Sequence, residues 1–210
     1  MLLGSDGKMK SGKFAGETMR QAFKKGGSAD KVQKAKTDSK EAPNKSKPTV
    51  TERNAVEDYS TDKFQKINGA LRGESPIDGE SQTIVKRIDS YLAKSPKREG
   101  ASVRSFVIPE GREDEFKKML SVGSTYSDEA YLSTRKKPSL SDQAAFSSKS
   151  TAERGVVLKV NGKSGVDISG TSLNPGESEV LYPRGTKFKV DKVIYTKNGG
   201  ILAEISEVDS

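Results

Sequence analysis

Apolar positions near the start of the predicted domain recur at steps of three and four, the spacing of one face of an α-helix. The pattern predicts two short helices over 51–74, with a break at 60–62 where Ser-Thr-Asp caps the second one. A third helix is predicted over 81–94, and Pro96 and Gly100 end it.

Beyond residue 100 the pattern changes to short apolar runs between turn residues, which predicts strands. Two early strands are predicted at 101–108 and 129–134, and two short helices at 113–120 and 141–148. Five closely spaced strands follow, at 155–160, 164–169, 178–183, 186–195 and 201–208. Because helices come first and strands follow, the order predicts an α+β domain rather than an alternating α/β fold.

Charge separates the first quarter of the chain from the rest. Residues 1–48 hold 12 Lys or Arg and 5 Asp or Glu, a net charge of +7. Of the 37 basic and 29 acidic residues in total, this leaves 25 and 24, a net charge of +1, in 49–210. The polar composition of 1–48 predicts a basic, disordered tail before one folded domain at 49–210. Such a tail is expected either to be solvated or to contact nucleic acid, an anionic membrane or an export partner.

Missing residue types exclude several kinds of chemistry. The chain has no Cys and no His, which excludes a thiol nucleophile, a disulfide, a Cys/His zinc site and a Ser-His-Asp triad.

No apolar run approaches 18 residues, so no membrane span is expected. The opening "MLLG" is too short for the apolar core of a classical signal peptide, so export is expected to use another route.

Two carboxylates, Glu177 and Glu179, stand at the start of the predicted strand at 178–183. Residues two apart in a strand share one face, with Cα atoms about 6–7 Å apart. Such a pair is either two solvated glutamates or a pair that meets cationic or hydroxyl partners. The same-face spacing suits two different tasks on one side of a substrate better than a glycosidase pair across a sugar.

Residues that could serve as such partners occur in the two early strands. Arg104 lies inside the apolar strand at 101–108, where an unpaired cation is unfavourable unless the strand is an edge from which it reaches water. Ser133 and Thr134 place two hydroxyls at the end of the strand at 129–134, where β-propensity alone also accounts for them.

In this order the pieces resemble the mono-ADP-ribosyltransferase toxin superfamily, in its Arg–Ser-Thr-Ser–Glu-x-Glu branch of binary-toxin components and phage or secreted bacterial effectors. "YSTDKFQKINGALRG" is similar to the N-terminal helical motif of that superfamily, and "VRSF" to its first-strand arginine. "AYLSTR" is similar to its Ser-Thr-Ser strand, and "ESEVLYPRGTKFKV" to its Glu-x-Glu segment. The resemblance covers roughly residues 56–208 and implies two packed, mostly antiparallel sheets around an NAD cleft, with helices on the N-terminal side and no metal.

The resemblance implies a role for each matching residue. Arg104 would grip the diphosphate of NAD or its adjacent ribose. Ser133 would hold the Glu179 carboxylate by a hydrogen bond, and Thr134 would support the strand. Glu179 would bind the 2′-hydroxyl of the nicotinamide ribose and stabilise the oxocarbenium ion as nicotinamide leaves. Glu177 would orient the acceptor and receive its proton.

Five further residues are assigned to the cleft in the same way. Tyr59, Phe64 and Asn68 would line its adenine and phosphate side, Phe146 would pack on nicotinamide, and Lys149 would add a phosphate contact. The chain departs from the family pattern at three places: Arg135 replaces the last Ser of Ser-Thr-Ser, Phe64 stands where Tyr is common, and 169–176 lacks the aromatic residue that helps to recognise the target.

The activity implied is transfer of ADP-ribose from NAD to an arginine of a target protein, with release of nicotinamide. A glutamate at the position of Glu177 goes with arginine acceptors in this family, because a carboxylate can pair with a guanidinium and take its proton. Two alternatives stay open: an NAD glycohydrolase that uses the same site, and a non-enzymatic protein that binds nucleic acid through 1–48. A secreted, injected or phage-delivered effector that acts in the cytoplasm of a target cell is expected.

Overall fold

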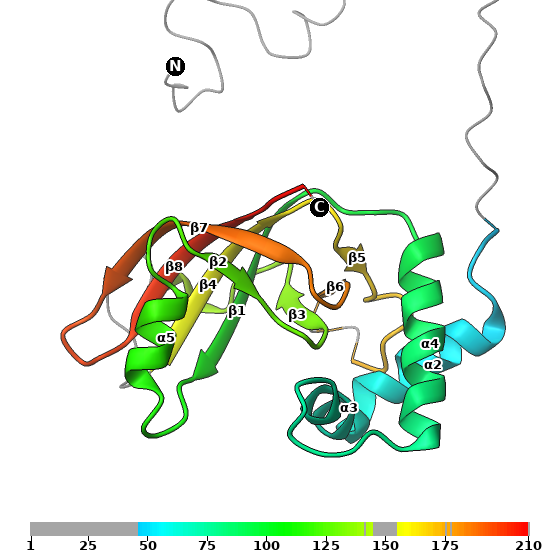
Figure 1. Ribbon diagram of the computed structural model, residues 1–210. Coiled ribbons are helices and arrows are strands. Elements are labelled where there is room, and N and C mark those ends of the chain that lie inside the picture. Colours follow the sequence, from blue (N-terminus) through cyan, green and yellow to red (C-terminus); the bar gives the residue numbers. More distant parts are fainter. Residues whose placement is uncertain (1–45, 141, 145–154, 175, 177, 210) are drawn as a thin grey trace, which may run out of the picture. The chain divides into compact units, whose positions relative to one another are not determined.

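The computed structural model describes residues 46–140, 142–144, 155–174, 176 and 178–209 (Figure 1). The tail predicted at 1–48 lies almost wholly outside the described residues. Three predicted site residues also lie outside them, namely Phe146, Lys149 and Glu177.

Helices form the first part of the described chain, as the apolar periodicity predicts: α2 (Val50–Asp58), the kinked turn η1 (Tyr59–Lys63), α3 (Phe64–Leu71) and α4 (Gly79–Lys94). At the start of α2 the Thr49 hydroxyl accepts from the backbone of Glu52 at 3.3 Å, and the Glu52 carboxylate accepts from the backbone of Thr49 at 2.7 Å. The break predicted at 60–62 is confirmed, because Thr61 leaves the helical conformation with φ −84° and ψ −159°.

Eight strands follow: β1 (Gly100–Val107), β2 (Thr125–Ser127), β3 (Leu132–Arg135), β4 (Gly155–Gly162), β5 (Val166–Asp167), β6 (Glu179–Tyr182), β7 (Lys187–Tyr195) and β8 (Ile201–Glu207). The helix α5 (Glu113–Met119) lies between β1 and β2 in the chain. The strand order is β2-β7-β8-β4-β1-β3-β6-β5, and β4 with β8 is the parallel pair among the described strands. The predicted α+β class with mostly antiparallel strands is confirmed.

The separate sheets that the resemblance implied are joined in one hydrogen-bonded sheet. β1 pairs with β4 along its whole length, from Gly100 opposite Gly162 to Val107 opposite Gly155. It meets β3 at a single register pair, Val103 opposite Arg135. The sheet therefore has a large part, made of β2-β7-β8-β4-β1, and a small part, made of β3-β6-β5. The two parts are joined between β1 and β3, which pair at one position and then diverge.

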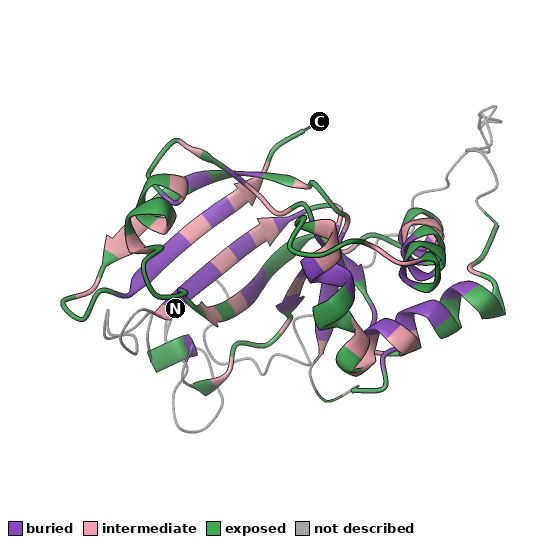
Figure 2. Ribbon diagram, turned by 60° about the horizontal axis from the view of Figure 1, so that its bottom comes forward, coloured by how far each residue is buried: buried purple, intermediate pink, exposed green. Residues whose placement is uncertain are grey.

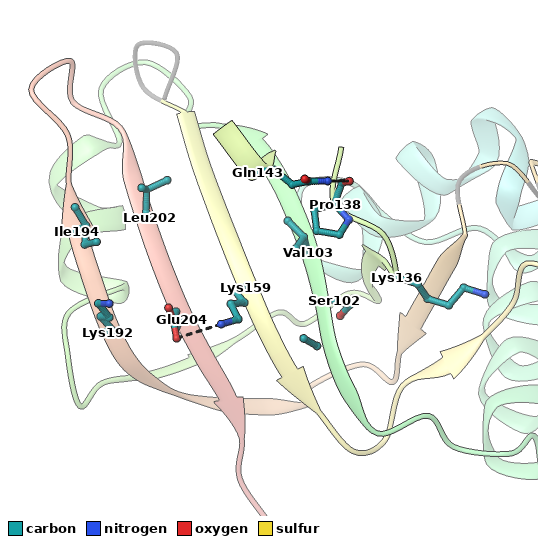
Figure 3. Close-up of a pocket in the computed structure, with 11 residues that line it drawn as sticks. Ser102, Val103, Lys136, Pro138, Gln143, Lys159, Lys192, Ile194, Leu202 and Glu204 are labelled. Carbon is teal, nitrogen blue, oxygen red and sulfur yellow. Dashed lines mark hydrogen bonds and ion pairs between the residues drawn. The ribbon is translucent and has the colours of Figure 1, made fainter. Parts of the chain in front are cut away.

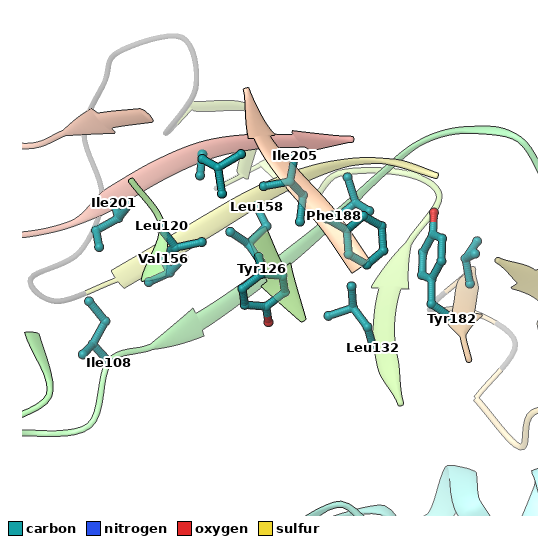
Figure 4. Packing of buried hydrophobic residues seen from close by; sticks show 14 residues of the cluster. Ile108, Leu120, Tyr126, Leu132, Val156, Leu158, Tyr182, Phe188, Ile201 and Ile205 are labelled. Atoms are coloured by element: carbon teal, nitrogen blue, oxygen red, sulfur yellow. The ribbon is translucent and has the colours of Figure 1, made fainter. Parts of the chain in front are cut away.

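Each part of the sheet has its own hydrophobic core. The larger cluster packs residues of the long strands β4, β7 and β8 with Tyr126 of β2 and with Leu120, which directly follows α5 (Figure 4). The second cluster joins α2, η1, α3 and α4 to the small part of the sheet. Figure 2 shows buried residues interrupted by intermediate ones along β4 and β8, whereas β7 begins with a strict alternation of exposed and buried residues.

The strand β6 is buried on both faces and connects the two cores. Val180 and Tyr182 belong to the larger cluster, whereas Leu181 belongs to the helical one. Because alternate residues share a face, Glu179 points to the same side as Leu181, toward the helices. None of the helices in the described segments is long and apolar enough to cross a membrane.

Candidate active site

The antiparallel register of β3 and β6 brings Ser133 to Glu179. Ser133 lies opposite Leu181 and Arg135 opposite Glu179, and the Ser133 hydroxyl donates to Oε1 of Glu179 at 2.5 Å. Only 7% of Glu179 is exposed, so this hydrogen bond holds a carboxylate that is largely removed from water. Thr134 points the other way, and its buried hydroxyl donates to the carbonyl of Val180 at 3.1 Å, which supports the strand pair.

Arg104 reaches the same place from β1. Its Nη1 donates to the carbonyl of Ser133 at 2.9 Å, and its guanidinium carbon lies 5.8 Å from the ring centroid of Phe106. β1 is an internal strand between β4 and β3, so the interpretation of Arg104 as an edge arginine that reaches water is wrong. Its side chain instead reaches from β1 to the backbone of β3, beyond the single register pair of the two strands.

The kink after α2 supplies the opposite wall. Tyr59 is 2% exposed, and its hydroxyl accepts from Nδ2 of Asn68 at 2.9 Å. Burial raises the pKa of the Tyr59 hydroxyl, which therefore stays protonated at neutral pH. The Asn68 Oδ1 atom is buried and has no hydrogen-bond partner among the described residues. A buried acceptor of this kind in a pocket wall fits a ligand that brings a donor.

These residues enclose a pocket of about 390 Å³. Its lining joins predicted residues with others that the sequence analysis did not assign: Tyr59, Ser60, Phe64, Gln65, Asn68, Arg72, Arg104, Ser133, Asn174 and Glu179. Six predicted residues are thus brought together, and Thr134 lies behind them on β3. A small pocket of about 100 Å³ adjoins Glu179 and is lined in part by Arg135, the residue that departs from Ser-Thr-Ser.

A second pocket, of about 350 Å³, lies on the other side of Arg72 and Arg104, which line both pockets. It is bordered by the aromatic rings of Phe106, Phe116 and Tyr126. Arg72 belongs to the predicted helical motif, but its place in the cleft is not predicted from the sequence. Its place between the two pockets depends on where the end of α3 meets the β2–β3 loop, which the local sequence pattern does not specify.

The segment before β6 is tied to the helical kink. The backbone of Leu173 donates to the Ser60 hydroxyl at 3.0 Å, and Nδ2 of Asn174 donates to the Ser60 carbonyl at 3.0 Å. Ser178 then adopts φ 51°, a conformation that is uncommon for residues other than glycine, directly before Glu179. The roles predicted for Glu177, Phe146 and Lys149 stay predictions because those residues are not described.

A larger pocket of about 500 Å³ lies on the outer face of the large part of the sheet (Figure 3). Its charged side chains include Lys159 and Glu204, which form an ion pair at 3.6 Å, and Lys192 on β7. This pocket is not lined by Arg104, Ser133 or Glu179. We therefore identify the candidate active site by its side chains and not by its volume. The described residues contain no cluster of three or more His, Cys, Asp or Glu side chains that could hold a metal ion.

The structure thus combines an arginine on one strand, a serine–glutamate pair on two others and a wall of N-terminal helices. This is the arrangement that the resemblance to ADP-ribosyltransferases predicts. The model of the ADP-ribosyltransferase exoenzyme family matches residues 33–205, and the chain belongs to this family. The predicted membership of the toxin superfamily is thereby confirmed.

One curated relative is the NAD(+)--protein-arginine ADP-ribosyltransferase Tre1 of Serratia proteamaculans, which is 29% identical over 137 residues. The match covers 65% of this chain and 27% of Tre1. The curated relatives are much longer than the chain, which spans 17% to 30% of their length.

Solved structures share the fold. The ADP-ribosyltransferase Vis, a toxin from Vibrio splendidus solved in complex with agmatine, superposes with a TM-score of 0.62 at 23% identity. The match covers 78% of this chain and 76% of Vis. Exoenzyme S of Pseudomonas aeruginosa, solved with human 14-3-3 protein beta and carba-NAD, gives a TM-score of 0.59 at 21% identity. That match covers 76% of this chain and 74% of the other.

Proposed function

We propose that the chain transfers ADP-ribose from NAD to an arginine side chain of a target protein and releases nicotinamide. The observation that carries the proposal is the convergence of Arg104, Ser133 and Glu179 on one pocket wall, with the Ser133–Glu179 hydrogen bond at 2.5 Å. Family membership and the arginine-specific names of relatives such as Tre1 support it.

The cleft consists of two adjoining pockets, and both this arrangement and the size of the pockets suit a dinucleotide. Ligand pockets typically measure about 300–1,000 Å³. The pockets of about 390 and 350 Å³ meet at Arg72 and Arg104. Two guanidinium groups at the middle of a long cleft suit a diphosphate, with a nucleoside on each side. The buried Oδ1 of Asn68 would accept a hydrogen bond from one of these nucleosides.

When it is bound, NAD supplies a glycosidic bond to nicotinamide, and cleavage of this bond leaves positive charge on the ribose. Glu179 would stabilise that charge, because its carboxylate is fixed by Ser133 before the reaction and is shielded from water. Arg104 would hold the diphosphate, because its contacts with the Ser133 carbonyl and the Phe106 ring fix the guanidinium in advance.

The acceptor is inferred to be arginine. A guanidinium has a pKa above about 12 and is a poor nucleophile until it loses a proton, and Glu177 would receive that proton. Vis was solved with agmatine, a guanidinium compound, which supports an acceptor of this chemical class. The toxin and exoenzyme names of relatives support an effector that is secreted or injected and modifies a protein of a target cell.

The test is incubation of the protein with labelled NAD and a cell lysate, followed by mass spectrometry of the modified side chains. We expect ADP-ribose on arginine together with free nicotinamide. Free ADP-ribose without labelled protein would identify an NAD glycohydrolase instead. The test is repeated with lysates from several types of target cell. The proposed activity would be refuted if NAD stayed intact in all of them.

A further inference from the structure

We infer that Asp128 is a positioning residue that presents the guanidinium of Arg72 to the diphosphate of the dinucleotide. The inference rests on the proposed function, because it assumes that the cleft binds NAD. It begins from one ion pair, in which Nε of Arg72 donates to Oδ1 of Asp128 at 2.9 Å and Nη2 donates to Oδ2 at 2.7 Å.

This pair occupies one edge of the Arg72 guanidinium and leaves another edge for a ligand. A bidentate contact fixes the plane of an arginine side chain as well as its position. Nε and one proton of Nη2 are used by Asp128, and Nη1 has no hydrogen-bond partner among the described residues. The Arg72 side chain is 34% exposed and lines both pockets of the cleft.

Asp128 is itself held in place. Its Oδ1 accepts from the backbone of Ala130 at 3.0 Å, and its backbone carbonyl accepts from the backbone of Gly185 at 2.9 Å. Its side chain is only 11% exposed. The carboxylate is therefore a fixed point on the β2–β3 loop, to which the mobile end of a long arginine side chain is attached.

The two arginines of the cleft are held in the same manner. Arg104 is attached to the Ser133 carbonyl and Arg72 to Asp128, and each retains donors for a ligand. Two cations that face one cleft repel each other, and a carboxylate beside one of them reduces this repulsion while nothing is bound. Asp128 would thus allow the cleft to keep both arginines in a binding geometry before NAD arrives.

Asp128 has two opposite effects on an anionic ligand, and the structure indicates which one prevails. Its negative charge repels the diphosphate, and Asp128 itself lines the pocket of about 350 Å³, but its ion pair with the partly exposed Arg72 offsets this charge and solvent screens the remainder. Because Asp128 orders the Arg72 side chain in advance, less conformational entropy is lost when the ligand binds. Unlike the charge repulsion, this contribution is not reduced by solvent screening. We therefore expect loss of Asp128 to weaken NAD binding.

The experiment measures the Kd for NAD by calorimetry, and KM and kcat for nicotinamide release, on the full chain. Asp128→Ala and Arg72→Ala are each expected to raise Kd and KM by about tenfold or more, the effect of losing one charged hydrogen bond, with kcat changed less than about threefold. The double variant is expected to resemble Arg72→Ala, because the two residues act through one contact. Asp128→Glu, which keeps a bidentate carboxylate, should restore part of the affinity.

Asp89→Asn is the matched control. Asp89 binds Arg184 through two guanidinium nitrogens, at 3.2 and 2.6 Å, in a pair that joins α4 to the turn after β6 and borders neither pocket of the cleft. Its replacement should leave Kd and KM unchanged. Thermal unfolding of every variant identifies those that lose the fold, and Asp128→Asn then serves as the milder change.

Three results would overturn the inference: an unchanged or lower Kd in a folded Asp128→Ala variant, additive effects of the two substitutions, or a fall in kcat with KM constant. In each of these cases, a wild-type protein that transfers ADP-ribose from NAD to arginine leaves the proposed function intact. A wild-type protein that neither binds nor cleaves NAD would overturn both.

Discussion

Replacing the Glu179 carboxylate by an amide tests the central electrostatic argument. Glu179→Gln keeps the shape of the side chain, and the amide oxygen can still accept from the Ser133 hydroxyl that now donates at 2.5 Å. The substitution therefore removes one negative charge from a position that is 7% exposed and changes little else.

The magnitude follows from the burial of this group. A carboxylate about 4 Å from a unit positive charge stabilises it by about 4 kcal/mol at an effective dielectric constant of about 20, but by only about 1 kcal/mol in water. Because Glu179 is shielded from water, the larger figure applies. A loss of about 4 kcal/mol from the transition state lowers the rate roughly 10³-fold.

The assay is single-turnover release of nicotinamide from NAD, with the Kd for NAD measured in parallel. We expect a rate lower by about 10³ and a Kd within a few fold of wild type, because the charge acts on the transition state. Thermal stability should stay equal or rise, because a buried carboxylate is replaced by a neutral group. Glu204→Gln, which loses an ion pair with Lys159 on the outer face, is the control. A Glu179→Gln variant that retains more than a tenth of the rate would refute the reasoning.

Three further predictions concern other residues. Arg104→Ala should raise the KM for NAD by about tenfold or more through loss of a charged contact, and steady-state kinetics with an unchanged KM would exclude the proposed grip. Glu177→Gln should lose transfer to arginine but keep some NAD hydrolysis, so equal labelling of arginine by variant and parent would contradict the role of that carboxylate. Lys94, with Ser90 and Thr49, lowers the pKa of Glu52 to about 2. The ionised Glu52 should therefore stabilise the fold fully above about pH 4.5 and progressively less as the pH falls toward 2. Glu52→Gln should reduce the free energy of unfolding by about 1–3 kcal/mol at pH 7 and by less at pH 3, as urea titrations at both pH values would measure.

Much of the cleft follows from local sequence signals. Strand alternation predicts where Glu179 points, and the Ser133 hydroxyl lies on a short strand whose pattern is visible in the local sequence. The helical break at 60–62 is marked by capping residues, and the structure confirms it at Thr61. Glu177 is two residues from Glu179, but its predicted role remains untested because it is not described.

The remaining features depend on contacts between distant segments. Arg72 and Asp128 are 56 positions apart, and Ser60 and Asn174 are 114 positions apart. No periodicity reports such pairs, because each member is an ordinary polar residue in its own segment. The strand β2 was also missed, since three residues, Thr125–Ser127, are too few to show an alternation.

The join between the two parts of the sheet explains why the cleft lies where it does. β1 and β3 pair at one position and then diverge, so the Ser133 carbonyl beyond this pair accepts from a side chain, that of Arg104. A fully paired β1–β3 ladder would satisfy that carbonyl with backbone and leave no space for a guanidinium. The same divergence places Glu179, at the start of β6, beside the helical wall rather than inside a sheet core. The cation and the carboxylate therefore line one pocket because the sheet is incomplete at this point.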